Sequence, residues 1–341
     1  MTRRHFRCPE CGDAGYPADG VVGIEGYLSP RMRRLACRLA GDQAFDVAAE
    51  RMWELLKVRV DGETLRRHCE AEGAAMAEWV RNHSDAAGSF RSASGEAEVQ
   101  VDAGKVNTTC GWRDLKVVVF AKRPLGPAAT PTEWDSRSLP RPRARFVLAD
   151  IEGIETFRRD WRDWADRLGI GSGRQLSVLG DGAEWIWSAA TAQFPGSRQV
   201  LDVFHALEHV GAATVGLYGE KTGAAQASFA LGRTALLSDG WNGVCRWVSE
   251  ELALSDTEER RKVLDELLGY VSKHTTRMDY RDRLAEGRSI GSGLVEGSIK
   301  TMGLRLKARG ARWIERNVES MAALVALGQS CTWNCYWALA V

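Results

Sequence analysis

The chain has 341 residues, of which 44% are apolar and 27% are charged, as in a globular protein with a large core. No run of about 18 apolar residues occurs, and the basic start MTRRHFRCPECG lacks the apolar stretch of a signal peptide. We therefore expect a cytoplasmic protein. The net charge of +1 gives no general attraction for nucleic acid, so any such binding must rest on local basic patches.

Residues 1–28 contain one Cys-x-x-Cys pair, formed by Cys8 and Cys11. Such a pair is half of the ligand set of a zinc ribbon. His5 and a fourth ligand that the sequence does not identify would complete the site, and the alternative is two free thiols. We expect a partial zinc-knuckle-like N-terminus, in which the pair either binds zinc or remains as two free thiols.

Residues 29–82 follow a helical pattern, and Ser29-Pro30 is a typical helix start. The middle helix is expected to present one apolar face, made of Ala48, Met52, Leu55 and Leu56.

The segment VRVDGETLRR then joins two helices through a short connector, as in a helix-turn-helix. We expect a DNA-binding module in which Arg66 and Arg67 contact base edges in the major groove. A three-helix dimerisation bundle is the alternative.

Residues 83–98 are rich in Ser, Ala, Gly and Asn and indicate a linker. Two strands follow, in EVQVDAGKVNT and WRDLKVVVFAKR, and a third is expected in RFVLADIEG. Between the second and third strands, the segment RPLGPAATPTEWDSRSLPRPRAR is expected to be a long exposed hairpin loop.

Helices and short apolar strands then alternate, with strands in QLSVLGDG and RQVLDVF. The predicted order is β-β-β-α-β-α-β-α, an α/β fold with a mixed sheet flanked by helices, in which residues 96–205 form the first part of the core. Residues 206–288 are expected to be entirely helical. Residues 289–330 hold a glycine-led helix with Glu296 and a final helix.

Three carboxylates from distant segments are candidates for a catalytic centre. Asp102 lies inside a strand, Asp181 directly follows an apolar strand, and Glu296 stands in the first turns of a helix. Hard carboxylate oxygens are suitable ligands for Mg²⁺, and two such ions about 3.5–4 Å apart stabilise the attacking and leaving oxygens of a phosphoryl displacement. By position alone, Asp150 is an equal candidate.

The sequence segments around these residues resemble the core of insertion-sequence DDE transposases of the ISKra-four family. The matching stretches are VQVDAGKVNTTCGWRDLKVVVF (99–120), GDGAEWIW (180–187), FPGSRQVLDVFHALEHV (194–210) and IGSGLVEGSIKTMGLRLKARGARW (290–313). One departure is the sequence Asp102-Ala103-Gly104, where the family commonly has a glycine-containing turn after its first aspartate.

The resemblance implies an RNase H-like core with Asp102 and Asp181 as its aspartates and Glu296 as its glutamate. It favours Asp102 over Asp150. It also implies two bound Mg²⁺ ions, for which Mn²⁺ substitutes, and it makes residues 206–288 an insertion between the last core strand and the glutamate helix.

Asp202-x-x-His205 resembles the (C/D)xxH element of related eukaryotic transposases, which implies that His205 acts near the scissile DNA. The alternative is a packed histidine at a helix start. A zinc pair made of His205 and His209 would need a third ligand, for which Glu208 is a weak candidate.

Basic residues after the glutamate are expected to hold DNA phosphates, together with the proline- and arginine-rich loop. They are Lys300, Arg305, Lys307, Arg309 and Arg312.

The resulting expectation is a transposase that cleaves and joins DNA at terminal inverted repeats and forms a homo-oligomer on DNA. The alternatives are a catalytically silent DNA-binding relative and a glycosidase with paired carboxylates.

Overall fold

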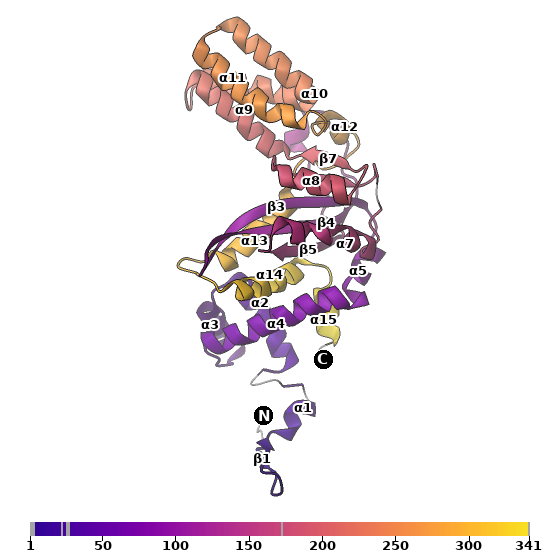
Figure 1. Ribbon diagram of the computed structural model, residues 1–341, viewed down its shortest axis with the longest axis vertical. Coiled ribbons are helices and arrows are strands. Elements are labelled where there is room, and N and C mark those ends of the chain that lie inside the picture. The colour runs from indigo at the N-terminus through magenta and orange to yellow at the C-terminus, as the bar shows by residue number, and fades with distance from the viewer. Residues whose placement is uncertain (1–3, 22, 25–27, 172, 340–341) are drawn as a thin grey trace.

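The computed structural model describes residues 4–21, 23–24, 28–171 and 173–339. At its centre lies a five-stranded mixed sheet with the strand order β5-β4-β3-β6-β7 (Figure 1). The strands are β3 (Glu96–Thr108), β4 (Gly111–Arg123), β5 (Ala144–Asp150), β6 (Ser177–Gly180) and β7 (Arg198–Leu201).

The order of elements along the chain confirms the expected β-β-β-α-β-α-β-α pattern. Strands β3, β4 and β5 form an antiparallel meander, and β6 and β7 then add in parallel beside β3. The connecting helices are α6 (Ile154–Arg159), α7 (Trp161–Arg167), α8 (Glu184–Gln193) and α9 (Val203–Tyr218).

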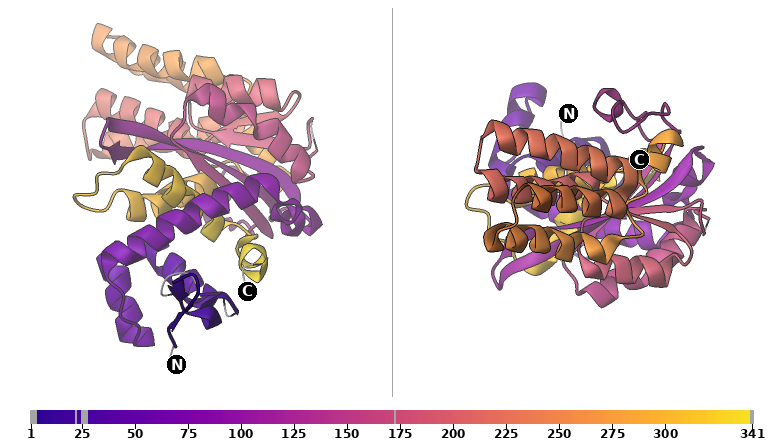
Figure 2. Two further views of the ribbon diagram at one scale, coloured as in Figure 1. Left: turned by 60° about the horizontal axis from the view of Figure 1, so that its bottom comes forward. Right: turned by 90° about the horizontal axis from the view of Figure 1, so that it is seen from above.

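Both faces of the sheet are covered, because successive residues of a strand point to opposite sides. On β4, Val118 and Phe120 pack with α7 to α12, whereas Val117 and Val119 pack with the N-terminal and C-terminal helices. Asp102 shares the second of these faces with Val106. The views agree that helices lie above and below the sheet (Figures 1 and 2).

The predicted N-terminal helices are confirmed as α2 (Pro30–Asp42), α3 (Phe45–Leu56) and α4 (Gly62–Asn82). Ser29 caps α2 as expected and accepts a hydrogen bond from the backbone N–H of Met32 at 3.4 Å. The apolar face predicted for α3 is partly wrong. Ala48 and Met52 are buried, but Leu55 is 69% exposed and Leu56 is 36% exposed. Both leucines lie in the last turn of α3, which ends at Leu56.

Helices α2 to α4 pack directly on the sheet. Met52, Leu65 and Met76 belong to the same apolar cluster as the glutamate helix α13 (Gly293–Leu306) and helix α14 (Glu315–Gln329). Gly73 permits a close crossing, since a Cβ on this residue would stand 2.1 Å from the backbone oxygen of Ser320. The N-terminal helices therefore have no separate core.

The linker expected at residues 83–98 is wrong over most of its length. It contains a 3-10 turn at Ser84–Ala86 and helix α5 (Gly88–Ser92), and strand β3 already begins at Glu96. The Phe90 side chain is fully buried against the sheet, which anchors this small-residue segment.

The loop between β4 and β5 is ordered by contacts with the rest of the chain instead of extending into solvent. The backbone N–H groups of Gly126 and Ala129 donate to the carbonyls of Gly287 and Leu284. The Arg137 guanidinium is half-buried and donates to the carbonyl of Arg288 at 2.9 Å. A short 3-10 turn at Trp134–Ser136 contacts Phe204 of α9.

Residues 206–288 are helical, as expected, within the part of the chain that the structure describes. They contain most of α9, then α10 (Gly223–Leu254), α11 (Glu258–Val271), a 3-10 turn (Ser272–His274) and α12 (Tyr280–Ala285). Helix α10 is broken at Asp239 and Gly240. Helices α9 to α11 project from the sheet at one end of the molecule (Figure 1).

The remaining elements lie at the two ends of the chain: strands β1 (Phe6–Arg7) and β2 (Ala14–Gly15), and helices α1 (Pro17–Val21) and α15 (Trp333–Leu339). No described helix combines the length and the apolar character that crossing a membrane requires.

Replacing Gly73 by Ala tests the crossing of α4 and α14. Although Ala favours a helix interior by about 1 kcal/mol over Gly, its Cβ would meet the Ser320 backbone, which has little freedom to move. We expect the free energy of unfolding to fall by about 1–3 kcal/mol in urea titrations.

The matched control is Gly269→Ala in α11, where an added Cβ meets no atom within 4 Å. This variant is expected to be as stable as the parent or more stable, by up to about 1 kcal/mol. A Gly73→Ala protein as stable as the Gly269→Ala protein would contradict the close crossing.

Candidate active site

Three aspartates lie side by side where β3, β6 and β7 meet. Val101 of β3 pairs with Gly180 of β6, and Gly180 pairs with Leu201 of β7. The next residue of each strand is an aspartate: Asp102, Asp181 and Asp202. Because neighbouring strands are about 4.8 Å apart and parallel partners point to the same side, these carboxylates form one row.

Glu296 is brought to this row by hydrogen bonds at the start of α13. The Gln100 side chain, which points from β3 to the same side as Asp102, accepts from the backbone N–H groups of Leu294 at 2.9 Å and Val295 at 3.2 Å. Gln100 is buried, and this pair of bonds fixes the first turn of the helix on the strand.

Asp202 forms a second anchor for α13. Its Oδ2 accepts from both the backbone N–H and the hydroxyl of Ser292, the hydroxyl at 2.7 Å. The Ser292 hydroxyl also lies 3.3 Å from Oε1 of Glu296. The Oδ1 of Asp202 accepts from Phe204 N–H at 2.7 Å and His205 N–H at 3.0 Å, which caps α9. Asp202 thus connects two helices that carry candidate catalytic residues.

The pKa of Asp102 responds to several of the other predicted site residues. The pKa of Asp102 is raised from 3.8 to about 6, chiefly by burial and also by the nearby carboxylates of Asp181 and Glu296. A backbone hydrogen bond from Ala103 and the proximity of His205 act in the opposite direction. Asp181, Glu296 and His205 therefore lie within electrostatic range of Asp102.

The carboxylates of Asp102, Asp181 and Glu296 lie against neutral hydrogen-bond donors. Asp102 accepts from Ala103 N–H at 2.6 Å and Asp181 from Ala183 N–H at 2.8 Å. Among residues 4–21, 23–24, 28–171 and 173–339, neither aspartate has an ion-pair partner within 4.0 Å, and the same holds for Glu296. A divalent cation would supply the missing positive charge.

The donor set fits magnesium in its chemistry, since all three side chains are carboxylates. In the described part of the chain, however, no three His, Cys, Asp or Glu side chains are grouped tightly enough to hold one ion. The fold brings the donors together, and coordination would require their side chains to turn toward a common point.

Asp150, the competing candidate, lies elsewhere. It ends the edge strand β5 and is separated from Asp102 by the whole of β4, whose Lys116 it pairs with. The choice of Asp102 therefore agrees with the position of the row of carboxylates.

The histidines of α9 lie beside the site. His205 is about one-third exposed, and its Nδ1 is 3.4 Å from Oε2 of Glu208. The ring of His209 instead stacks on Tyr270 of α11, with ring centroids 3.5 Å apart. Burial lowers the pKa of His209, and the proximity of His205 lowers it further.

Tyr270 is a site residue that sequence reasoning missed. Its ring covers Gly182, directly after Asp181, so closely that a Cβ on Gly182 would be 2.6 Å from the tyrosine hydroxyl. Burial raises the pKa of Tyr270 well above its ordinary value, and Asp181 and Asp202 raise it further. The helical region of residues 206–288 thus supplies one wall of the site, and no local signal in α11 marks this tyrosine.

The predicted DNA-contacting residues fall into two groups. Lys300, Lys307, Arg309 and Arg312 are exposed on or after α13. Arg305 is only 3% exposed and lies between the rings of Phe45 and Trp313, so it cannot reach a phosphate in this structure. The prediction that Arg305 contacts DNA is therefore wrong, because its side chain packs between α3 and α13.

The two arginines of the expected recognition helix α4 also differ. The Arg66 guanidinium forms ion pairs with the carboxylates of Glu63 at 2.6 Å and Glu70 at 2.5 Å, and these pairs offset its positive charge. Arg67 is 66% exposed.

Cys8 and Cys11 lie at the turn between β1 and β2. Cys8 exchanges backbone hydrogen bonds with Asp13 and Gly12, as a knuckle would require. Hydrogen bonds from Cys11 and Glu10 lower the pKa of the Cys8 thiol. No third ligand joins them in the described ranges, where the His5 ring packs against Tyr16.

Comparison of the chain with models of known protein families and with curated proteins gave no match.

Replacing Asp102 by Asn tests whether burial and the neighbouring carboxylates disfavour its ionised form in the folded chain. The folded-state pKa of about 6 lies above the ordinary value of 3.8. Between these values the folded chain keeps a proton that the unfolded chain releases, so stability falls as the pH rises through this window. An asparagine cannot ionise. We therefore expect Asp102→Asn to raise the melting temperature more at about pH 7.5 than at about pH 4.

The measurement is thermal unfolding in the presence of a chelator, with Asp265→Asn on α11 as the control for loss of a carboxylate elsewhere. A gain for Asp102→Asn that is the same at both pH values would show that folding does not disfavour the ionised form of Asp102.

Proposed function

We propose that the chain is a DDE transposase that cuts and joins DNA by metal-dependent phosphoryl transfer. The observation that supports this most is the proximity of Asp102, Asp181 and Glu296, which have no ion-pair partner within 4.0 Å among the residues that the structure describes. The meander of three antiparallel strands followed by parallel strands and helices also supports an RNase H-like core.

The three carboxylates would hold the magnesium ions that the resemblance implies. When bound, such ions supply Lewis-acid stabilisation of the oxygens that enter and leave phosphorus, and manganese would replace them. The carboxylate row defines where the scissile phosphate lies. The anchors on α13, provided by Gln100 and Asp202, hold Glu296 in register with the strands.

Exposed basic groups lie where the DNA backbone would approach. Lys300 is one helical turn beyond Glu296. The Nζ of Lys307 lies 3.7 Å from the position of a Cβ on Gly104, which shares a face of β3 with Asp102. These groups would offset phosphate charge beside the carboxylates. His205 is close enough to Asp102 to interact with it electrostatically.

A catalytically silent DNA-binding relative would not need the unpaired carboxylates, whose mutual repulsion costs stability. A glycosidase would need no cationic helix beside its carboxylates. Both alternatives are therefore less well supported than the transposase.

The decisive experiment measures nicking of a duplex that carries the terminal inverted repeats of the encoding element. We expect magnesium-dependent nicking that falls at least about 100-fold in Asp181→Asn, because the metal-held carboxylates contribute several kcal/mol to the barrier. Asp265→Asn is the matched control and should nick like the parent. Equal nicking by the parent and Asp181→Asn would remove the carboxylate proposal.

Replacing Lys307 by Gln tests the DNA path. We expect weaker duplex binding and a salt dependence, measured as the slope of log K against log salt, that is smaller by about 1, the value for one lost phosphate contact. Lys262→Gln, an exposed position of α11, is the control. An unchanged slope for Lys307→Gln would place the DNA elsewhere.

A further inference from the structure

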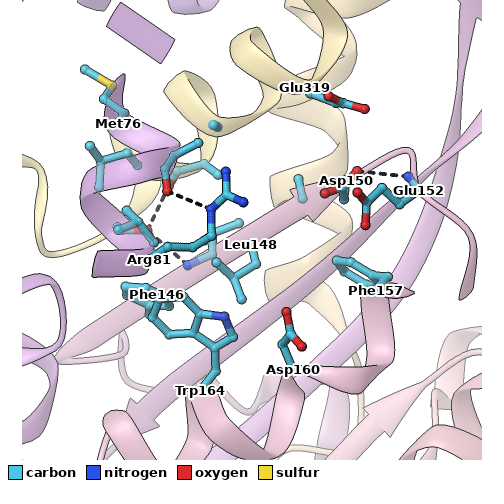
Figure 3. A pocket seen from close by; sticks show the side chains of 18 of the residues that line it. Met76, Arg81, Phe146, Leu148, Asp150, Glu152, Phe157, Asp160, Trp164 and Glu319 are labelled. Carbon is cyan, nitrogen blue, oxygen red and sulfur yellow. Dashed lines mark hydrogen bonds between the residues drawn. The ribbon is translucent and has the colours of Figure 1, made fainter. Parts of the chain in front are cut away.

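A second concave site lies on the far edge of the sheet, away from the carboxylate row. It is a cavity of about 420 Å³ that runs along β5 between α4 and α14 on one side and α6 and α7 on the other (Figure 3). This size is within the range of ligand-binding pockets. None of its lining residues takes part in the site proposed above.

The floor of this cavity is the free edge of β5. The carbonyl of Arg145 and the N–H of Val147 point away from β4 and bond to Cys331 N–H and the Ser330 hydroxyl. Because backbone groups of an antiparallel strand alternate in direction, Ala149 points its N–H and carbonyl to the same edge. No described residue pairs with them there. The C-terminal half of β5 is therefore an open strand edge.

The walls differ in chemistry. Phe157 and Trp164 form an apolar wall on the side of α6 and α7, while the α4 and α14 side is lined by small residues that include Ala77 and Ala323. An extended peptide on the edge would direct alternate side chains to these two walls.

One end of the cavity is acidic. Asp150, Glu152 and Glu319 gather there (Figure 3), and none of them has an ion-pair partner within 4.0 Å in the described part of the chain. Burial and the neighbouring carboxylates raise the pKa of Glu319 and of Glu152. The cationic groups near this end are fewer than the carboxylates left to balance. Arg159 already pairs with Asp160 at 3.2 Å, and the Lys116 ammonium donates to the backbone carbonyl of Glu152 at 2.5 Å. Arg81 also lines the cavity, without an ion pair to these carboxylates within 4.0 Å in the described part of the chain.

We propose that this cavity binds an extended, basic peptide segment of a partner protein, which adds a strand to β5. Its main chain pairs with Ala149, an apolar side chain enters between Phe157 and Trp164, and a Lys or Arg reaches Glu319 and its neighbours. A second copy of this chain fits less well. Pairing two copies through so short a free edge would bring their Asp150 carboxylates together.

The probe is a fluorescein-labelled, end-capped hexapeptide of alternating Val and Lys, with the Val–Glu hexapeptide as its counterpart. Fluorescence polarisation with the full chain is expected to show at least about 10-fold tighter binding of the Val–Lys peptide. Glu319→Lys should reverse or abolish this preference, whereas the exposed control Glu258→Lys on α11 should leave it unchanged. Hydrogen exchange at the Ala149 amide should slow on peptide binding.

Several outcomes would overturn the proposal. They are equal affinity for the two peptides, a preference that Glu319→Lys does not change, or binding without protection of the Ala149 amide. Self-association that Glu319→Lys strengthens would assign the edge to a second copy instead. Because the readout does not depend on DNA cleavage, its failure is distinguishable from failure of the proposed catalytic function.

Discussion

The arrangement of the site depends on one buried carboxylate. Asp202 is fully buried, and its two oxygens accept four hydrogen bonds, two from the start of α9 and two from Ser292. A buried charge is tolerated only when such donors replace water. The cost of leaving those donors unsatisfied forces α9 and α13 to meet at the end of β7, although the two segments are 90 residues apart in the chain. The contact between the two helix starts therefore positions His205 on α9 and Glu296 on α13.

Much of this site could be predicted from local patterns. The apolar strand that ends in Gly180 indicates that Asp181 lies at a strand end, and the glycine-led helix gives Glu296 a defined turn. The pattern could not separate Asp102 from Asp150, because both stand on apolar strands. The strand order decides between them, since β3 is central and β5 is an edge. Strand order is set by packing over the whole sheet, which no single segment encodes.

Other features required tertiary structure. Arg305 follows the same basic pattern as Lys300 and Lys307, but the rings of Phe45 and Trp313, from segments far away in sequence, enclose it. Burial lowers its pKa to about 10, so it remains a cation within an aromatic environment. Gln100 and Tyr270 were missed for the same reason. Nothing in its own strand or helix distinguishes either residue. Gln100 is placed by its bonds to the start of α13, and Tyr270 by its contact with Gly182.

The continuous packing of the N-terminal helices with α13 and α14 has a consequence for how this protein can vary. A recognition unit with its own core can be exchanged between relatives without disturbing catalysis. Here, Met52 and Met76 fill the same apolar layer as Met302 and Met321. Under the proposed function, any new sequence specificity would have to arise through substitutions that keep this shared interior filled, so target choice and the alignment of Glu296 would evolve together.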